Sequence, residues 1–348
     1  MALNYTDTAV LLAAYKQQKA PNTFLQNRYF PDGTVFTTSQ VLVEYKDGNQ
    51  KLAPFVSPEV GGKAVRRDGY KATAYEPAFI APKRALTIDN LTKKGFGEAL
   101  YGELTPEERA VKITADDLTE MDEMIVRRQE EMCAQVLQEN ALTMKHYGDD
   151  NKVVDTKVIE YFEGTNGAVY TPNTNWDSAD ADILGDVAAI AKILTKRGLP
   201  ATDVILGSEA ADAFLNNEKI QKLLDNRNYN IGTVDPTENF PEATFLGVIN
   251  CKGRKMNFIQ YDATYEDENG ADTPYINPKD IIVTAPGCGV TNYGAITQIN
   301  FGESMPRTHA EKRVPLYAIK DQVREVALRT APLVQPKHKN AFIKATVL

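Results

Sequence analysis

The sequence predicts a mixed α+β fold in which strands and a smaller α/β unit are arranged around one long helix. Three observations lead to this prediction. Residues 114–147 follow a helical period, residues 41–88 contain strand and turn patterns, and residues 179–300 alternate helical with strand-like segments. The 348 residues favour two domains or one elaborate domain, and the 43% hydrophobic and 25% charged content is typical of a globular protein.

The long helix is predicted from both of its ends and from one apolar stripe. Thr114 or Asp116 can cap the N-terminus, and Lys145 and His146 precede Gly148 at the other end. The stripe recurs at steps of three, four and seven residues and consists of Leu118, Met121, Ile125, Met132 and Val136. At about 1.5 Å per residue such a helix is roughly 45 Å long, so we expect a spine along which other segments lie.

A leader precedes the strands. It has a predicted short helix at 7–18 and then a mostly irregular run with aromatic anchors. These anchors show no sustained period; they are Phe24, Leu25, Tyr29, Phe30 and Phe36. Two alternatives remain open, because such a segment can pack over its own domain or dock on a neighbouring chain.

A basic ribbon follows. The segments GKAVRR and YKATAY flank Asp68–Gly69, which is a strong signal for a tight hairpin. The two arms carry four basic side chains, Lys63, Arg66, Arg67 and Lys71, but little more than Val65, Tyr70 and Tyr75 as apolar surface. An isolated ribbon of this composition is marginal in water, so either its own domain or another subunit must cover it.

Behind the long helix the pattern changes to an α/β unit. Helices are predicted at 178–197 and 208–216 with a strand at 201–207 between them, and three further strands follow before residue 300. Residues 301–348 return to alternating strands, which we expect to pair beside the long helix and to close a discontinuous first domain.

Composition excludes several classes of protein. The formal net charge is −8 with no basic stripe, which argues against strong binding to nucleic acid or to an anionic membrane. No apolar run reaches the roughly eighteen residues of a membrane span. Three widely spaced cysteines favour reduced, buried thiols over a disulfide framework or a metal cluster; they are Cys133, Cys251 and Cys288.

Signatures of catalysis are missing from the sequence. The histidines His146, His309 and His338 lie far apart, and the acidic residues at 116–131 fit the solvated face of a helix. Cys288 lies between two glycines without an identifiable histidine beside it, and no phosphate loop or nucleophile elbow is present. We therefore predict no enzyme and no catalytic, cofactor-binding or metal-binding residue.

The order of the segments carries a resemblance. It rests on TDTAVLLAA, FLQNRYFP and FTTSQV, then FVSPEVGGKAVRRDGYKATAYEPAFIAPK, Trp176 before an acidic helix start, YINPKDIIVTAPG and VREVALRTAPLV. The most specific piece is the VSP…G…R…G segment from Val56 to Gly69. In this order the pieces resemble the major capsid protein E family of lambda-like tailed phages.

This resemblance implies the Hong Kong 97-type phage capsid fold, divided into four parts. Residues 1–40 correspond to the N-terminal arm and residues 41–88 to the extended loop. The peripheral domain would comprise 89–178 and 301–348, with the spine helix at 114–147, and the axial domain would comprise 179–300.

The function implied by the resemblance is that of a major capsid protein, which assembles through pentamers and hexamers into an icosahedral shell around double-stranded DNA. Implied partners are further copies of the chain, a portal, packaged DNA bound without sequence specificity, and optionally a decoration protein. Because the chain starts almost at the arm, we expect the scaffolding protein to be separate. The expected locations are the virion capsid and, during assembly, the host cytoplasm, with no membrane association.

Loop and arm contacts between neighbouring subunits are implied as well. The candidate interface residues are Phe24, Tyr29 and Phe30 on the arm and Arg66, Arg67 and Tyr70 on the loop. Two alternatives to the capsid hypothesis remain: an α/β hydrolase or transferase that uses residues 179–300, and another phage structural component such as a tail or decoration protein.

Overall fold

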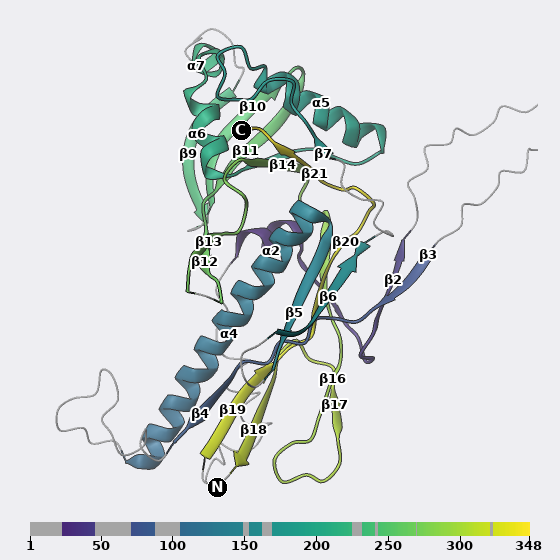
Figure 1. The fold of residues 1–348 in the computed structure, drawn as a ribbon, viewed down its shortest axis with the longest axis vertical. Coiled ribbons are helices and arrows are strands. Elements are labelled where there is room, and N and C mark those ends of the chain that lie inside the picture. Colours follow the sequence, from purple (N-terminus) through teal and green to yellow (C-terminus); the bar gives the residue numbers. More distant parts are fainter. Residues whose placement is uncertain are drawn as a thin grey trace, which may run out of the picture.

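The computed structural model describes residues 23–45, 71–87, 105–148, 153–161, 169–224, 232–240, 243–268, 270–320 and 323–348. The predicted helix at 7–18 and the tight turn at Asp68–Gly69 lie outside this part of the chain. Among the described helices, none is both long enough and apolar enough to cross a membrane. Figure 1 shows a long helix, α4, that runs from beneath a mixed α/β unit along a set of strands.

The long helix is confirmed, but it begins earlier than predicted. Helix α4 spans Pro106–Glu139. Thr105 accepts a hydrogen bond from the Glu108 N–H through its side chain, and the Glu108 carboxylate accepts one from the Thr105 N–H in return. This reciprocal capping box and the proline in the first turn fix the start near Thr105 rather than Thr114.

The helix also ends earlier than the predicted 114–147. Asn140 adopts a left-handed conformation with φ 53°, and its N–H donates to the Val136 carbonyl. This terminates the helix, and the next residues form strand β5, Ala141–Tyr147. The sequence from 141 alternates buried and more exposed positions, a period of two that indicates a strand and overrides the basic residues we took as a helix end.

Several small sheets surround α4. Their strands are β1 (Asp32–Val35), β2 (Val41–Tyr45), β3 (Lys71–Tyr75), β4 (Lys83–Leu86), β6 (Val153–Glu160), β12 (Thr264–Glu266), β13 (Asp272–Pro274), β15 (Gly289–Tyr293), β16 (Ile296–Gln298), β17 (Arg307–His309), β18 (Val314–Lys320), β19 (Val323–Arg329) and β20 (Pro332–Pro336). The sheet orders are β1-β15-β20 and β18-β19-β4, together with the pairs β2-β3, β5-β6, β12-β13 and β16-β17.

The α/β unit is one seven-stranded sheet in the order β7-β21-β14-β8-β11-β10-β9. Its strands are β7 (Val169–Tyr170), β8 (Asp203–Leu206), β9 (Gly232–Phe240), β10 (Ala243–Cys251), β11 (Arg254–Tyr261), β14 (Asp280–Thr284) and β21 (Ile343–Thr346). The helices of the unit are α5 (Ile183–Lys196), α6 (Ser208–Asn216) and α7 (Glu218–Leu224). The sequence predicted this alternation, but α5 begins at Ile183 instead of residue 178.

One strand of this sheet, β21, corrects the predicted pairing of the C-terminal part. Strands β18 and β19 do pair beside α4, with β4. The last strand, β21, instead pairs antiparallel with β14 and parallel with β7, so the chain ends inside the α/β unit. β21 lies next to the edge strand β7, and its buried Ile343 and Ala345 join the apolar core of the α/β unit.

Apolar packing divides into clusters that follow these units. One cluster fills the α/β unit, a second holds the C-terminal half of α4 against the leader, and a third joins the N-terminal half of α4 to β18 and β19. The leader contributes helix α2, Phe24–Tyr29, to the second cluster. The fold is therefore a spine helix with separate cores along its length.

The helix end at Asn140 generates a stability prediction. The side-chain oxygen and nitrogen of Asn140 are buried without a hydrogen-bond partner in the described structure, and the backbone is left-handed. Asn140→Gly is expected to leave the free energy of unfolding unchanged or to raise it, whereas Asn140→Ala should lower it by about 1 kcal/mol because alanine tolerates a left-handed backbone less well than asparagine or glycine. Urea unfolding of both variants measures the difference, and an equal loss in both would contradict the prediction.

Candidate functional site

Helix α2 lies in a seam between α4 and the α/β sheet, and a carboxylate of α4 holds its N-terminal end. Glu130 is fully buried and accepts hydrogen bonds from the N–H groups of Leu25 at 2.7 Å and Gln26 at 2.9 Å. The Tyr261 hydroxyl of β11 donates to the same carboxylate at 2.7 Å. Free N–H groups at a helix start favour a negative charge, so Glu130 can be buried here.

A second buried carboxylate holds the other end of α2. Asp203, at the start of β8, accepts a hydrogen bond from Arg28 Nε at 2.7 Å and one from the Tyr29 hydroxyl at 3.1 Å. Asn257 on β11 donates to it at 2.8 Å. Burial, followed by the charge of Asp203, raises the pKa of Tyr29 well above its ordinary value, so the hydroxyl remains a donor at neutral pH.

The aromatic residues of the leader are core residues of their own chain. Phe24, Tyr29 and Phe30 are 2%, 0% and 0% exposed. The Phe24 ring packs edge-on against Tyr29, with 5.6 Å between centroids, and lies 5.4 Å from Tyr261. These three side chains have almost no exposed surface in this conformation, and their contact with a neighbouring subunit stays a prediction. The intrachain alternative describes them.

Backbone hydrogen bonds extend this anchoring beyond α2. The Gly287 N–H donates to the Arg28 carbonyl at 2.9 Å, and the Phe36 N–H donates to the Tyr293 carbonyl at 2.8 Å. Strand β1 pairs in parallel with β15. The predicted irregular run therefore contains a short helix and a strand, whose order comes from tertiary partners and not from a local period.

A polar network continues along the buried side of α4. Arg313 donates to Asp122 through Nε at 2.9 Å, with both side chains 6% exposed, and to Gln129 through Nη2 at 2.7 Å. Gln129 in turn donates to the Tyr293 hydroxyl at 3.2 Å, which donates to Asp32 at 2.7 Å. The network thus connects the spine helix to the segment before β18, to β15 and to β1.

Asp32 shows how this network tolerates charge. Burial by itself would raise the pKa of its carboxyl, but hydrogen bonds from Lys312 and Tyr293 outweigh burial and hold the pKa below its ordinary value. The Lys312 ammonium lies 2.6 Å from the carboxylate. Asp32 is therefore an anion that keeps β1 attached to the strands beside it.

Acidic residues of α4 were predicted to form a solvated face, and three of them do not. Asp122, Glu130 and Glu131 are buried, whereas Glu120 and Glu123 are on the open side. The signal that could have found them is periodicity. Asp122 and Gln129 fall on the same three-and-four-residue stripe as Leu118, and Glu130 falls four residues after the buried Val126.

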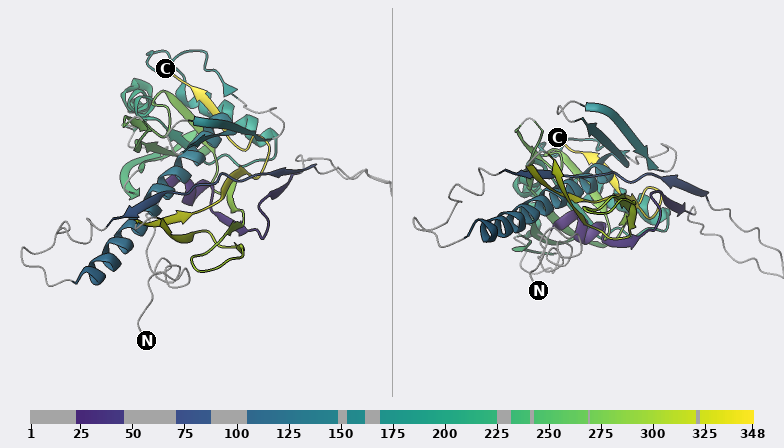
Figure 2. Two further views of the ribbon diagram at one scale, coloured as in Figure 1. Left: turned by 60° about the horizontal axis from the view of Figure 1, so that its bottom comes forward. Right: turned by 90° about the horizontal axis from the view of Figure 1, so that it is seen from below.

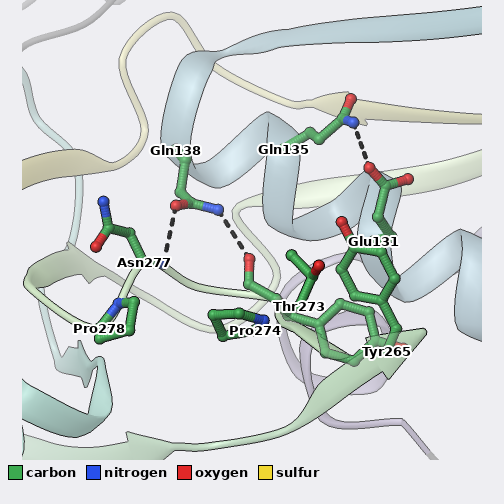
Figure 3. A pocket seen from close by; sticks show the side chains of 9 residues that line it. Glu131, Gln135, Gln138, Tyr265, Thr273, Pro274, Asn277 and Pro278 are labelled. Atoms are coloured by element: carbon green, nitrogen blue, oxygen red, sulfur yellow. Dashed lines mark hydrogen bonds between the residues drawn. The ribbon is translucent and has the colours of Figure 1, made fainter. Parts of the chain in front are cut away.

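A pocket of about 330 Å³ opens between α4 and the loop around Asn277. Figure 3 shows Gln135 and Gln138 directed into this region from the helix, opposite Tyr265 and Pro274. Gln138 Nε2 donates to the Tyr275 carbonyl at 2.9 Å, and its Oε1 accepts from the Asn277 N–H at 3.2 Å. These polar groups already bond within the chain, so the pocket is a crease between helix and sheet.

The β2–β3 pair is fixed to the β5–β6 hairpin. Strands β2 and β3 pair antiparallel from Val41↔Tyr75 to Tyr45↔Lys71, so residues 71–75 of the YKATAY arm are confirmed as a strand, and their described partner is β2. The predicted pairing of this arm with GKAVRR lies outside the described residues. The Tyr75 ring lies 5.5 Å from Tyr161, and Lys157 on β6 bonds to Glu76. The candidate loop residues Arg66, Arg67 and Tyr70 lie outside the described residues and stay predictions.

The cysteines are free and buried. Cys288 contacts the Tyr29 carbonyl through its thiol, and burial raises the pKa of that thiol to about 11. Burial likewise raises the pKa of Cys133 on α4 well above its ordinary value. Almost no reactive thiolate is present at neutral pH, which favours the structural role. Among the described residues, no group of three histidine, cysteine or acidic side chains is arranged to hold a metal ion.

Solved structures first define the class of protein. The chain is similar to a capsid protein of an Escherichia coli CFT073 prophage with a TM-score of 0.66 at 16% identity, covering 98% of this chain and 99% of that one. It is also similar to a chain of the mature capsid of bacteriophage PhiM1, with a TM-score of 0.50, 11% identity and coverage of 95% and 88%. The fold is the Hong Kong 97-type phage capsid fold that the resemblance implied.

Sequence comparison then gives the family. Residues 7–347 match the family described as phage major capsid protein E. The major capsid protein of Enterobacteria phage phi80 is 22% identical over 348 residues, covering 97% of this chain and 98% of that protein. Those of Enterobacteria phage P21 and Escherichia phage lambda are 25% and 24% identical over 49% and 53% of this chain. The matched stretch spans about half the length of these two relatives, 49% and 54%. The chain belongs to the phage major capsid protein E family.

The hydrogen bonds that Glu130 accepts from the start of helix α2, called the α2 clamp below, can be tested by replacing Glu130. Glu130→Leu leaves two N–H groups and the Tyr261 hydroxyl without their acceptor, so it should lower the free energy of unfolding by roughly 3 kcal/mol or more. Tyr261→Phe removes one donor and should lower it by about 1 kcal/mol. Urea unfolding and the thiol reactivity of Cys288 measure the effect. A Glu130→Leu variant as stable as the original, with its thiols still protected, would contradict the clamp.

The buried ion pair makes a second prediction. Asp122→Leu leaves the buried Arg313 guanidinium without its carboxylate partner and should lower the free energy of unfolding by about 3–5 kcal/mol. Combining it with Arg313→Met removes both charges, so the double variant should be more stable than Asp122→Leu alone. A double-mutant cycle in urea tests this, and strictly additive losses would show that the two side chains act independently.

Proposed function

We propose that this chain is the major capsid protein of a tailed phage and assembles through pentamers and hexamers into an icosahedral shell around double-stranded DNA. The observation that carries the proposal is the family match over residues 7–347 on a chain with the corresponding capsid fold. A structural role also fits the seam around α2. The polar groups of α4 there form hydrogen bonds with their own chain and do not line an open cleft.

The extended loop is the feature that supports assembly most directly. Strands β2 and β3 form a sheet of two strands that leads away from the body, as both views of Figure 2 show. The residues between them, 46–70, are outside the described part and include Lys63, Arg66 and Arg67. A two-stranded ribbon is marginal alone, so a neighbouring subunit is its natural support. Such head-to-tail contacts close rings.

The arm has a different role from the one first expected. Because Phe24, Tyr29 and Phe30 are buried in their own chain, they fix the root of the arm. Contacts with neighbours then fall to the residues before 23. We place Arg66, Arg67 and Tyr70 at the loop interface, as the sequence led us to expect.

The remaining partners follow from the shell role. Scaffolding protein, portal and packaged DNA would interact with an assembled surface, and the net charge of −8 favours weak contact with the DNA, without sequence specificity. A decoration protein would bind the outside of the shell. We place the protein in the virion capsid, with assembly in the host cytoplasm, and we infer no catalytic role.

Assembly of the expressed protein tests the proposal. The purified chain, or the chain expressed with its scaffold, should form rings or closed particles of megadalton size in negative-stain micrographs and in size-exclusion chromatography. A persistent 38.5 kDa monomer with a substrate-dependent melting shift would favour the α/β enzyme instead. Tubes or trimers would indicate a tail or decoration component.

The loop residues can be tested by reversing charge. Arg66→Glu with Arg67→Glu should leave the unfolding midpoint nearly unchanged and reduce particle formation strongly, because the loop would no longer match its neighbour. The matched control, Arg66→Lys with Arg67→Lys, keeps the charge and should retain most assembly. Particles that form equally well in the Glu variant count against the assignment.

A further inference from the structure

Strand β6 presents an open edge at the margin of the molecule. In the described structure β5 and β6 form a sheet by themselves, so one edge of β6 has no neighbouring strand. The inner face is buried through Leu142 and Ile159, whereas Val154 and Val158 are 74% and 52% exposed. The right-hand view of Figure 2 shows this hairpin, in teal, at the upper margin. An exposed apolar edge strand is a surface that readily pairs with another strand.

The polar backbone groups on this edge follow from the β5–β6 register. The Tyr161 N–H donates to the Asn140 carbonyl at 3.3 Å, and the same register continues along the hairpin to Asp155. Hydrogen-bonded and non-hydrogen-bonded pairs alternate in an antiparallel ladder, so the odd-numbered residues of β6 bond to β5. The N–H and C=O groups of Thr156 and Val158 therefore point to the open edge.

We propose that β6 pairs antiparallel with β6 of a second copy of this chain, in the register that sets Thr156 opposite Thr156. Val154 then lies opposite Val158, and Asp155 lies opposite Lys157. Both cross-strand combinations, apolar with apolar and acid with base, are favourable. The outer faces join into one Val-Thr-Val surface across the contact.

Charge selects this register over its neighbours. In the two nearest registers that keep the outer faces of both strands on the same side, the two-fold centre of the pairing moves from residue 156 to residue 155 or 157. The first places Asp155 opposite Asp155, and the second places Lys157 opposite Lys157. Like charges directly opposite each other are destabilising. Lys157 also bonds to Glu76 within its own chain, which holds its side chain on the inner face of the hairpin.

The contact would be isologous, with a two-fold axis at Thr156. It rests on the proposed function and deepens it, because head-to-tail contacts close a ring whereas a two-fold contact joins subunits of different rings. A second copy of the chain is the occupant favoured here, since the strand is complementary to itself in charge and in apolar side chains.

Crosslinking of assembled particles tests the register. In Thr156→Cys the two cysteines would have Cα atoms about 5.5 Å apart, within the usual disulfide range of about 4.4–6.8 Å. The native cysteines are buried and do not compete. Mild oxidation should give a reducible band at twice the chain mass. The control is Thr143→Cys on β5, because strands about 4.8 Å apart place the two β5 copies roughly 14 Å apart, and it should stay monomeric on the gel.

Charge exchange gives a second readout. In the Thr156→Cys background, Asp155→Lys should reduce the dimer yield several-fold, and Asp155→Lys with Lys157→Asp should restore it because the opposite pair is re-formed. Particles that contain no Thr156→Cys dimer, equal dimer in the Thr143→Cys control, or a double variant as low as the single would each overturn the inference and leave the capsid role intact. A chain that never assembles would overturn both.

Discussion

Buried charge on the long helix is the constraint on which the rest of the structure depends. A carboxylate taken out of water must receive hydrogen bonds or an opposite charge, and two buried acids of α4, Glu130 and Asp122, receive them from other parts of the chain. Glu130 receives them from the start of α2 and from β11, and Asp122 receives them from Arg313. These hydrogen bonds tie the leader, the α/β sheet and the C-terminal strands to the same helix, and they fix how α4 meets the α/β unit.

The same constraint separates surfaces that belong to the subunit from surfaces that are left for assembly. Aromatic side chains of the leader are used within the chain, where Asp203 and Glu130 hold the two ends of α2. Among the described strands, open edges include the ribbon of β2 and β3 and the outer edge of β6. Open strand edges are normally hazards for a soluble monomer. In the shell that we propose, these edges would become contacts between copies of the chain.

Sequence reasoning predicted the elements more reliably than their partners. Apolar periodicity indicated α4 and the alternation of 179–300, and the segment order indicated the family. It misplaced the helix ends, because the capping box at Thr105 and the left-handed Asn140 outweigh the charged residues used as end signals. It also assigned Glu130 to the solvated face, although Glu130 lies four residues after Val126 and therefore on the same side of the helix. The residues that hold α2 come from α4, β8 and β11, and no local pattern links them.

By itself the sequence determined the helix, the strands and the family, because period, turn chemistry and segment order are local properties that the chain carries in one dimension. Only the tertiary structure decided that β21 enters the α/β sheet and that Phe24, Tyr29 and Phe30 face inward. It alone decided which acids are buried. These outcomes depend on contacts between residues far apart in the sequence, such as Leu25 with Glu130, and the free energy of such a contact depends on both residues together.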